Sequence, residues 1–225
     1  MYLINLEYLL WVAPAMVLGL IAQAWVRSAY ASAQRMPAPL SGAAAARHIL
    51  DSAGLVNVDV QAVRGHLSDH YDPRHKVLRL SHQVYNSRSL AAVGIAAHEA
   101  GHAIQDAREY APLVIRNVAV PAAGFGSQIG MLLMLLGLFF STFLLWVGIA
   151  LFSCVVFFQV VNLPVEFNAS RRAKAQLAEL GIVDRRGMPY VNNVLSAAAL
   201  TYVAATLEAI LILLYFLSAA QRRND

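Results

Sequence analysis

The feature that most constrains the fold is a run of 49 residues, 117–165, that holds no Asp, Glu, Lys or Arg. A bilayer span needs about 20 mostly apolar residues, and a single helix of that length would extend about 73 Å, over twice the hydrocarbon thickness. The run is therefore predicted to form two spans joined by a tight turn at about 137–142. Such a hairpin places its two ends, Arg116 and Glu166, on the same side of the membrane.

Two further stretches, 8–26 and 199–219, are long and apolar enough to cross a bilayer. The first also resembles a secretory signal, because "AQA" at 22–24 looks like a cleavage site. However, no Lys or Arg precedes it and its apolar part is long for a signal, so a retained anchor is predicted. Hydrophobic residues make up 59% of the chain and charged residues 13%, against about 45–50% and 25% in soluble domains. The sequence thus predicts a mainly α membrane protein with four transmembrane helices.

The four spans divide the chain into six predicted parts. These are helix 1 (1–26), a first polar segment (27–116), the hairpin (117–165), a second polar segment (166–198), helix 4 (199–220) and a tail (221–225). Of the 17 Lys and Arg residues, ten lie in the first polar segment, five in the second and two in the tail. The positive-inside rule therefore predicts that both polar segments are cytoplasmic. The net charge of +4, without a dense basic stripe, fits contact with the lipid bilayer and no nucleic acid.

The first polar segment reads as a small α+β module. Residues 41–55 are predicted to form a helix capped by a serine, and 89–107 a long alanine-rich helix. The stretches 55–63 and 75–82 are predicted strands, and the residues between them carry turn chemistry. A module of about 80 residues is small for independent stability, so it is expected to pack against other parts of the chain.

The motif that carries chemistry is HEAGH, residues 98–102, on the second predicted helix. Residues four apart share a helix face, so His98 and His102 can both direct a ring nitrogen at one metal ion. Glu99 lies beside that ion, where it can accept a proton from a water. The alternative, a His-Glu-His set satisfied by neighbours, would leave buried polar groups in need of partners on an apolar face. The pattern favours a catalytic Zn²⁺ site.

A catalytic zinc ion normally has three protein ligands, so two histidines require a third donor. Glu166 is the preferred candidate, because the predicted hairpin returns it towards HEAGH and residues 165–180 look helical. The interpretation that leaves Glu166 without a metal is an ion pair with Arg116 or Arg171. The other candidates for the third ligand are His66, His70, His75, His82, Asp69 and Asp72. The stretch around HEAGH is short for a span and interrupted by polar groups, so the site is expected at the membrane surface.

Three motifs are long and specific: HEAGHAIQ at 98–105, LSDHYDP at 67–73 and LPVEFNAS at 163–170. Through them the chain resembles the bacterial membrane-bound neutral zinc metallopeptidases of the YugP type, over almost its whole length. The resemblance implies a zincin-like module at the membrane surface, a bacterial plasma-membrane location, and peptide or protein substrates, membrane or misfolded proteins among them.

The resemblance also implies the roles of individual residues. In a gluzincin-like site, His98, His102 and Glu166 would bind Zn²⁺, and Glu99 would be the catalytic base. In other membrane zinc proteases with a similar E-x-x-A element, an Asp commonly follows the alanine, whereas Ser170 stands there in this chain. Another residue is then expected to orient the site.

Several other residues have both a functional and a structural interpretation. Asp106 could orient the metal site or be a solvated charge at a helix end. His70 or Tyr71 could stabilise the tetrahedral intermediate or only the turn. The strand 76–81 could be an edge that pairs with substrate or an ordinary member of the sheet. Glu208 could line a path to the site or bond within the bundle, to Tyr202 or Thr206.

These observations lead to two main functional hypotheses. The first is a membrane-anchored zinc endopeptidase, and the second is a non-catalytic membrane scaffold that retains the zinc fold. An intact Glu99 favours the first, since a scaffold needs ligands but no base. A transporter would rest only on the spans, whose few polar residues make a poor ion path.

Overall fold

A computed structural model of the 225-residue chain describes residues 6–65 and 68–223. The described chain is mostly helical, with one small sheet of three strands. It forms two compact units. The membrane unit comprises Met1–Ala22, Val114–Pro164 and Leu200–Asp225, and the polar unit comprises Gln23–Leu113 and Val165–Ala199.

Four helical segments are long and apolar enough to cross a membrane, as the sequence predicts. They are Leu6–Gln34 (α1), Ala111–Phe140, Thr142–Glu179 (α7) and Met188–Gln221 (α8). The second segment consists of α5 (Ala111–Phe125), the π-helical turn η1 (Gly126–Gly130) and α6 (Met131–Phe140). Only Ser141 separates α6 from α7, so the chain reverses within the stretch 137–142 where the turn is predicted.

The hairpin of the membrane unit is held by close backbone approach. A Cβ atom on Gly148 would lie 2.5 Å from the backbone nitrogen of Met134, and one on Gly137 would overlap the backbone of Leu145. Membrane helices lack a hydrophobic force that favours each other over lipid, so small residues that allow close packing supply the contact. Large apolar side chains complete this core, among them Met134, Leu145, Phe152 and Phe216.

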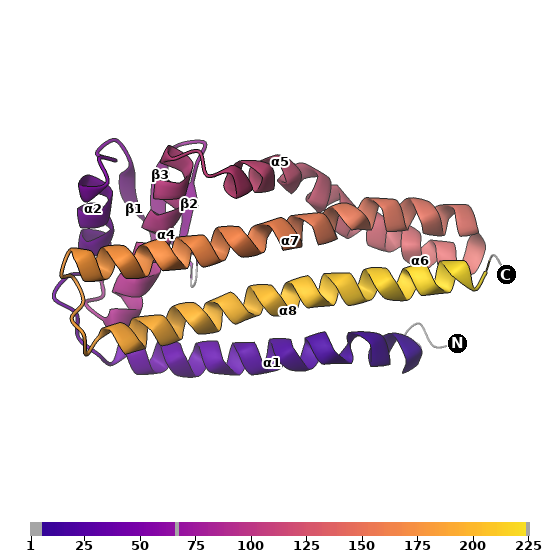
Figure 1. Cartoon of the computed structure of the whole chain (residues 1–225), viewed down its shortest axis with the longest axis horizontal. Coiled ribbons are helices and arrows are strands. Elements are labelled where there is room, and N and C mark those ends of the chain that lie inside the picture. Colours follow the sequence, from indigo (N-terminus) through magenta and orange to yellow (C-terminus); the bar gives the residue numbers. More distant parts are fainter. Residues whose placement is uncertain (1–5, 66–67, 224–225) are drawn as a thin grey trace. The chain divides into compact units, whose positions relative to one another are not determined.

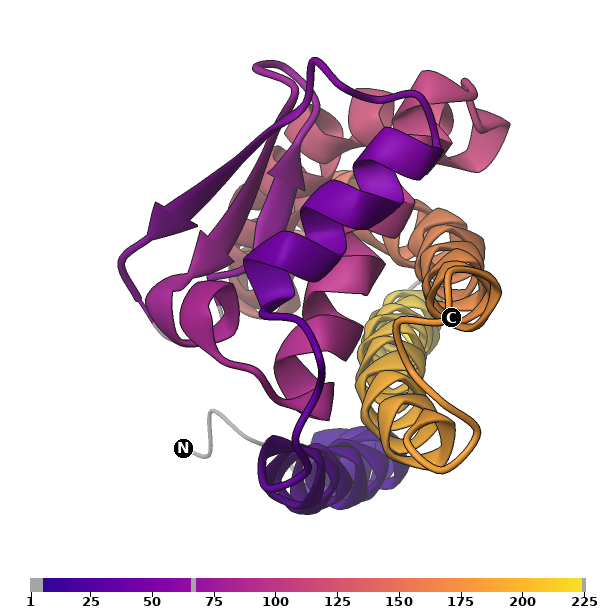
Figure 2. The same cartoon turned by 90° about the vertical axis from the view of Figure 1, so that its left-hand side faces the viewer.

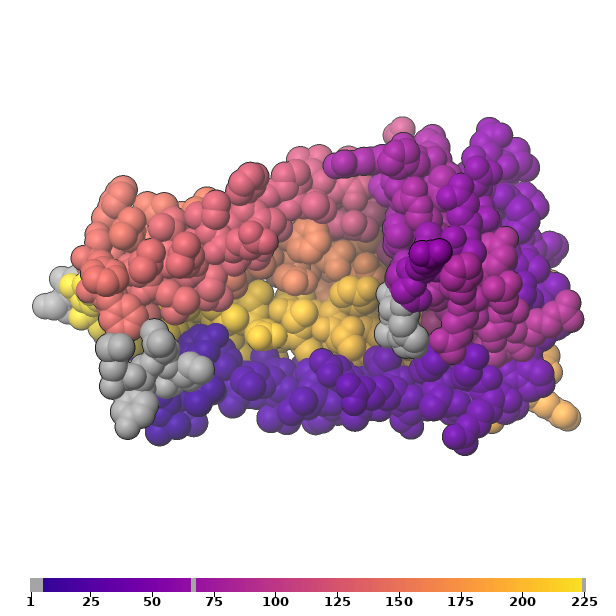
Figure 3. Space-filling model, turned by 180° about the vertical axis from the view of Figure 1, so that it is seen from behind, coloured from indigo at the N-terminus to yellow at the C-terminus, as the bar shows by residue number. Residues whose placement is uncertain are grey.

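The outward surfaces of the membrane unit are apolar. Val118 and Phe125 on α5 are exposed, as are Phe139 and Phe140 on α6. Figure 3 shows the side chains of α5 and α6 forming a continuous surface on that side of the unit. Glu208 on α8 is also exposed, and the hydroxyl of Thr206 donates to the backbone carbonyl of Tyr202.

Three membrane-capable helices, α1, α7 and α8, extend well into the polar unit. α7 runs without a break from Thr142 through Pro164 to Glu179 (Figure 1). α8 begins at Met188, eleven residues before the predicted start of its span at 199. The second polar segment therefore consists of the end of one long helix, a short connection and the start of another. The side chains that follow Val165 are thus carried on a rigid mount.

The polar unit is built around the small sheet. Its elements are α2 (Gly42–Ser52), β1 (Asp59–Val63), β2 (His70–Asp72), β3 (Val77–Ser81), α3 (His82–Asn86) and α4 (Leu90–Ala107). The strand order is β1-β3-β2, with β1 parallel and β2 antiparallel to β3. Figure 2 shows α2 and α4 beside each other on one face of the sheet. The side chains of Ser41 and Ser89 cap the two helices, as serine side chains commonly do.

The sheet differs from the sequence prediction in two ways. β2 lies in a stretch that was assigned to turns, because three residues between Ser-Asp and Asp-Pro show no strand periodicity. β3 is the central strand and is mostly buried, so the predicted strand 76–81 is an ordinary member of the sheet and not its edge. The edge next to α4 is β2 instead.

Candidate metal centre

α4 presents both motif histidines on one face. Ser89 accepts a hydrogen bond from the Ala92 amide at the start of the helix, and the helix continues unbroken to Ala107. The rings of His98 and His102 meet edge to face, with centroids 4.8 Å apart. The four-residue spacing therefore brings the two imidazoles together, as the sequence predicts.

Glu166 on α7 faces these two rings. Its Oε2 lies 3.2 Å from Nε2 of His98 and 3.7 Å from Nε2 of His102. One ligand atom from each of the three side chains lies within 4.8 Å of the other two, and no other such group occurs among residues 6–65 and 68–223. Two imidazole nitrogens and one carboxylate oxygen are the donor set of a catalytic zinc site. The three side chains therefore fit zinc in both chemistry and spacing.

The close approach of α7 to α4 depends on a glycine. A Cβ atom on Gly101 would lie 2.7 Å from the backbone oxygen of Ala169, closer than real Cβ contacts. Gly101 lies between the two motif histidines, and Ala169 is three residues beyond Glu166. The small residue inside HEAGH thus lets the helix of Glu166 reach the histidines.

The second ring nitrogen of each histidine also has a partner. Nδ1 of His102 lies 2.9 Å from Oε1 of Gln105, and Nδ1 of His98 lies 3.1 Å from Oγ of Ser170. An amide oxygen can only accept, so Nδ1 of His102 carries its proton and leaves Nε2 free for a metal. Ser170 thus contacts the site from the position where the sequence analysis noted the absence of an acid.

Gln105 is the residue that the sequence analysis missed. It is fully buried, and its Nε2 donates to the backbone oxygen of Val165 at 2.8 Å and to Oδ1 of Asn168 at 3.0 Å. Oδ1 of Asn168 also accepts from Nε of Arg172 at 2.7 Å. One amide therefore orients His102 and ties α4 to α7. The available signal was a glutamine three residues after the second histidine, on a helix whose residues before HEAGH are all apolar.

The prediction that Asp106 orients the histidines is not supported by its contacts. Its Oδ2 accepts a hydrogen bond of 2.8 Å from the hydroxyl of Tyr71. Burial, followed by this bond, raises the pKa of Tyr71, so the phenol remains a protonated donor at neutral pH. Asp106 therefore fixes the edge strand β2 against α4.

Glu99 is held beside the two histidines by the same strand. Its Oε2 accepts a hydrogen bond of 3.1 Å from the backbone amide of Tyr71. The carboxylate is partly exposed, as a group that exchanges protons with a water must be. Glu99 is thus oriented by β2 and does not belong to the three-residue ligand group.

Electrostatics in the site favour a shared cation. Burial alone would lower the pKa of His102, but the carboxylates of Glu166 and Glu99 and the Gln105 amide outweigh burial and raise it. The ion-pair partners of Glu166 in the described chain are the two histidines, and neither Arg116 nor Arg171 is among them. A proton or a metal ion between the rings and the carboxylate gives a partner to the imidazole nitrogens and to the Glu166 carboxylate.

The other candidates for the third ligand lie elsewhere. Asp69 accepts from the amide and hydroxyl of Ser81, and Asp72 is bound by His75 and Arg79. Nδ1 of His70 lies 2.8 Å from the Ser68 carbonyl, which fits the turn-stabilising interpretation of that residue. His82 is exposed at the start of α3, and His66 lies outside the described residues. None of the described candidates joins the group around HEAGH.

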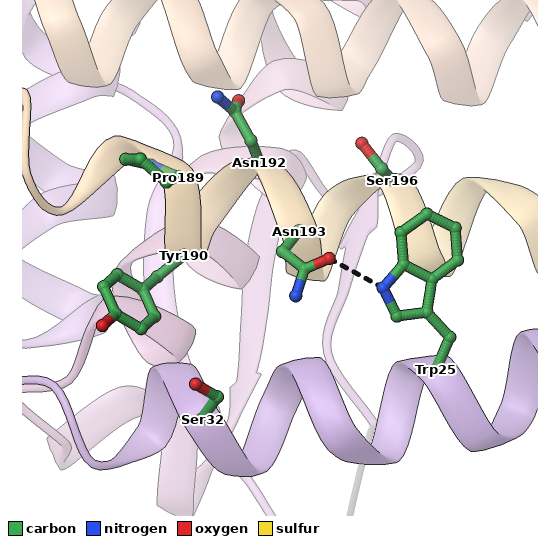
Figure 4. Close-up of a pocket in the computed structure, with 7 residues that line it drawn as sticks. All are labelled: Trp25, Ser32, Pro189, Tyr190, Asn192, Asn193 and Ser196. Atoms are coloured by element: carbon green, nitrogen blue, oxygen red, sulfur yellow. Dashed lines mark hydrogen bonds between the residues drawn. The ribbon is translucent and has the colours of Figure 1, made fainter.

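An open pocket of about 600 Å³ lies elsewhere in the polar unit, between α1 and α8 (Figure 4). Nε1 of Trp25 donates to Oδ1 of Asn193 across it at 2.7 Å. Its lining is neutral and includes no metal-ligating group. This pocket therefore does not offer a second metal site.

Comparison with known proteins agrees with this geometry. The model of a family described as "Putative neutral zinc metallopeptidase" matches residues 8–221. The chain belongs to this family. It is also 49% identical over 177 residues, 78% of this chain and 79% of the relative, to "Putative membrane protease YugP" of Bacillus subtilis (strain 168). Its cofactor is therefore Zn²⁺, and its membrane-capable helices suit a membrane protease. No solved structure matches the chain, so the zincin-like fold of the polar unit stays a prediction.

Proposed function

We propose that the chain is a membrane-anchored zinc endopeptidase. His98, His102 and Glu166 hold the zinc ion, and Glu99 is the general base. The observation that carries this proposal is that three potential ligand atoms lie within 4.8 Å of one another. They come from two helices, and His102 and Glu166 are 64 positions apart in the sequence. Family membership supports it independently.

The residues of the chain divide the work of peptide-bond hydrolysis. When bound, zinc supplies Lewis-acid chemistry, which polarises a carbonyl and makes a water more acidic. An Oε atom of Glu99 takes a proton from the attacking water and passes it to the nitrogen of the leaving amine. The Tyr71 amide holds this carboxylate in place, while Gln105 and Ser170 orient the two imidazoles.

The outer edge of β2 is the proposed place for the substrate backbone. β2 pairs with β3 on one side only, and its Tyr71 amide points away from β3 to Glu99. Because Glu99 engages the Tyr71 amide, an extended peptide would pair with this edge through the main-chain carbonyl of Tyr71. A substrate chain that lies along β2 can continue on both sides of the scissile bond. This arrangement suits an endopeptidase that acts on unfolded or membrane-protein segments.

We place the catalytic side in the cytoplasm. The support is the distribution of Lys and Arg, with 15 of 17 in the two polar segments. Cys154 is the only cysteine of the chain, so Cys154→Ala combined with His48→Cys leaves one cysteine, in the polar unit. The side of the membrane from which this cysteine can be labelled is the side of the polar unit. Labelling of intact cells by a membrane-impermeant maleimide would contradict the cytoplasmic placement.

The decisive variant for the mechanism is Glu99→Gln. It keeps the shape of the side chain but removes the base, so zinc content should be unchanged while hydrolysis of casein in detergent falls at least about 100-fold. Glu109→Gln, an exposed glutamate beyond the same helix, is the matched control and should retain activity.

The same pair of variants separates the peptidase from the non-catalytic scaffold. Equal cleavage by the parent and Glu99→Gln would reject Glu99 as the base. Absence of cleavage by the zinc-loaded parent on casein and on unfolded membrane-protein segments would favour the scaffold.

A further inference from the structure

Another polar pocket of the polar unit lies at the end of α4. It has a volume of about 320 Å³ and lies between the end of α4, the second half of α7 and the end of α2. The residues that give it its character are Arg108, Arg172, Gln176 and Glu179. It belongs to neither the HEAGH face nor the substrate edge β2.

Two arginines, Arg108 and Arg172, line this pocket, and in the described chain neither guanidinium forms an ion pair with an acidic side chain. Burial, followed by the charges of Arg108 and Arg171, lowers the pKa of Arg172. Nε of Arg172 donates to Asn168, so its orientation is set by the helix that carries it. Two like charges at one pocket are stabilised by an anion that contacts both.

The arrangement of charges selects the kind of anion. Guanidinium groups bind phosphate oxygens through paired hydrogen bonds, and two of them match the charge of a phosphate better than that of one carboxylate. The one acid in the pocket, Glu179, is seven residues along α7 from Arg172, or about 10 Å of helix. Its Oε2 accepts from Nε2 of Gln176 at 3.2 Å, so this carboxylate is engaged at the far end.

The position of the pocket along α7 indicates where a phosphate is available. Arg172 follows Val165, the last residue of the uncharged run, by seven residues, which is about 10 Å of helix. Basic side chains just beyond a span lie at the depth of lipid headgroups. A phospholipid phosphate and a free phosphate share the same recognition chemistry.

We propose that Arg108 and Arg172 form a phosphate-binding pocket, which takes the phosphate of an anionic phospholipid headgroup or a free phosphate. The binding test of this pocket needs no turnover. Its failure would leave the proposed function intact.

The first arm of the test uses the zinc-loaded full chain in a neutral detergent, with inorganic phosphate titrated by calorimetry. Arg108→Gln should weaken phosphate binding at least about tenfold, since a charge-assisted contact is lost. Arg108→Lys, which keeps the charge but loses the fork, should have an intermediate affinity. Glu179→Gln should bind phosphate more tightly than the parent, because a repelling charge is removed.

Arg171→Gln is the matched control, because Arg171 is exposed next to Arg172 but does not line the pocket. It should stay within about twofold of the parent. Arg108 is exposed at the end of α4, and unchanged zinc content and melting temperature would show that its variants fold.

The second arm distinguishes the two sources of phosphate. The chain is placed in nanodiscs of phosphatidylcholine with or without phosphatidylglycerol, and retained lipid is counted by native mass spectrometry. Phosphatidylglycerol retained by the parent and Arg171→Gln but lost by Arg108→Gln would identify a lipid site, and saturable binding of inorganic phosphate alone would identify a free-phosphate site. No saturable binding in either arm, or equal losses in Arg108→Gln and Arg171→Gln, would overturn the proposal.

Discussion

The membrane unit and the polar unit are both helical, but they are held together differently. The core of the membrane unit consists of large apolar side chains, with glycines where helices cross closely. The core of the polar unit is rich in alanine, and polar groups are buried where α4 meets α7. Seven of the nine buried polar side chains found in the described chain belong to the polar unit, and five of these lie at that contact: His102, Gln105, Glu166, Asn168 and Ser170.

The difference shows how one helix can serve two purposes. The first part of α7 packs by shape, so its contacts tolerate other apolar side chains of similar volume. The second part packs through hydrogen bonds whose partners must match in position and in donor or acceptor character. Substitutions at the α4–α7 contact of the polar unit should therefore change zinc affinity, whereas substitutions in the membrane unit should change stability alone.

The largest expected effect comes from removing the proposed third ligand. Glu166→Ala should lower zinc affinity by more than about 100-fold, because loss of even an outer partner of a ligand costs about 10–100-fold. Competition with a chromophoric chelator measures this directly. Glu179→Ala on the same helix is the control, and an unchanged zinc affinity of Glu166→Ala would remove Glu166 from the ligand set.

Gln105 should follow, because it connects a metal ligand to the helix that carries Glu166. Gln105→Leu should weaken zinc binding by about 10–100-fold, since His102 loses its acceptor. Gln105→Glu keeps that acceptor but places an oxygen against the Val165 carbonyl and Asn168. Gln105→Glu should bind zinc more tightly than Gln105→Leu. Its melting temperature should nevertheless be lower than that of the parent, because acceptor atoms face each other. Equal zinc affinity in the two variants would show that the bond to His102 is unimportant.

A pair of glycine variants compares the two units directly. Gly101→Ala and Gly137→Ala each force a Cβ against backbone atoms, and each should cost about 1–3 kcal/mol of stability. The helix propensity gained, about 1 kcal/mol, only partly offsets this overlap. Gly101→Ala should also lower zinc affinity, because it separates α4 from α7, whereas Gly137→Ala should leave it unchanged. A similar loss of zinc from both variants would contradict the distinction between the units.

The smallest effect is expected at Ser170. Its hydroxyl is a neutral partner of His98, so Ser170→Ala should weaken zinc binding by about tenfold or less. Ser170→Asp introduces the acid that related proteases commonly carry there, and it should tighten zinc binding relative to Ser170→Ala. The same chelator competition provides both values, and a weaker site in Ser170→Asp than in Ser170→Ala would show that the pocket cannot accept a carboxylate.

Much of the architecture was predictable because it depends on local pattern. The uncharged run, the serine caps and the four-residue spacing of His98 and His102 each act over a few helical turns. β2 was missed because three residues give no periodicity, and the central position of β3 depends on a parallel partner from before the turn. The choice of Glu166 over six other candidate ligands rested on the hairpin, which is a long-range argument from a simple feature.

The sequence by itself determined the membrane character, the helical hairpin and the HEAGH constellation, because hydrophobic length and helical period act along the chain. Only the tertiary structure decided which side chains complete the site. Gln105, three residues along the same helix from His102, and Ser170, which lies next to the close contact of Ala169 with Gly101, take the role expected for Asp106. A hydrogen bond between two helices forms only if their separation is correct to a few tenths of an ångström. The periodicity of either helix alone does not specify that separation.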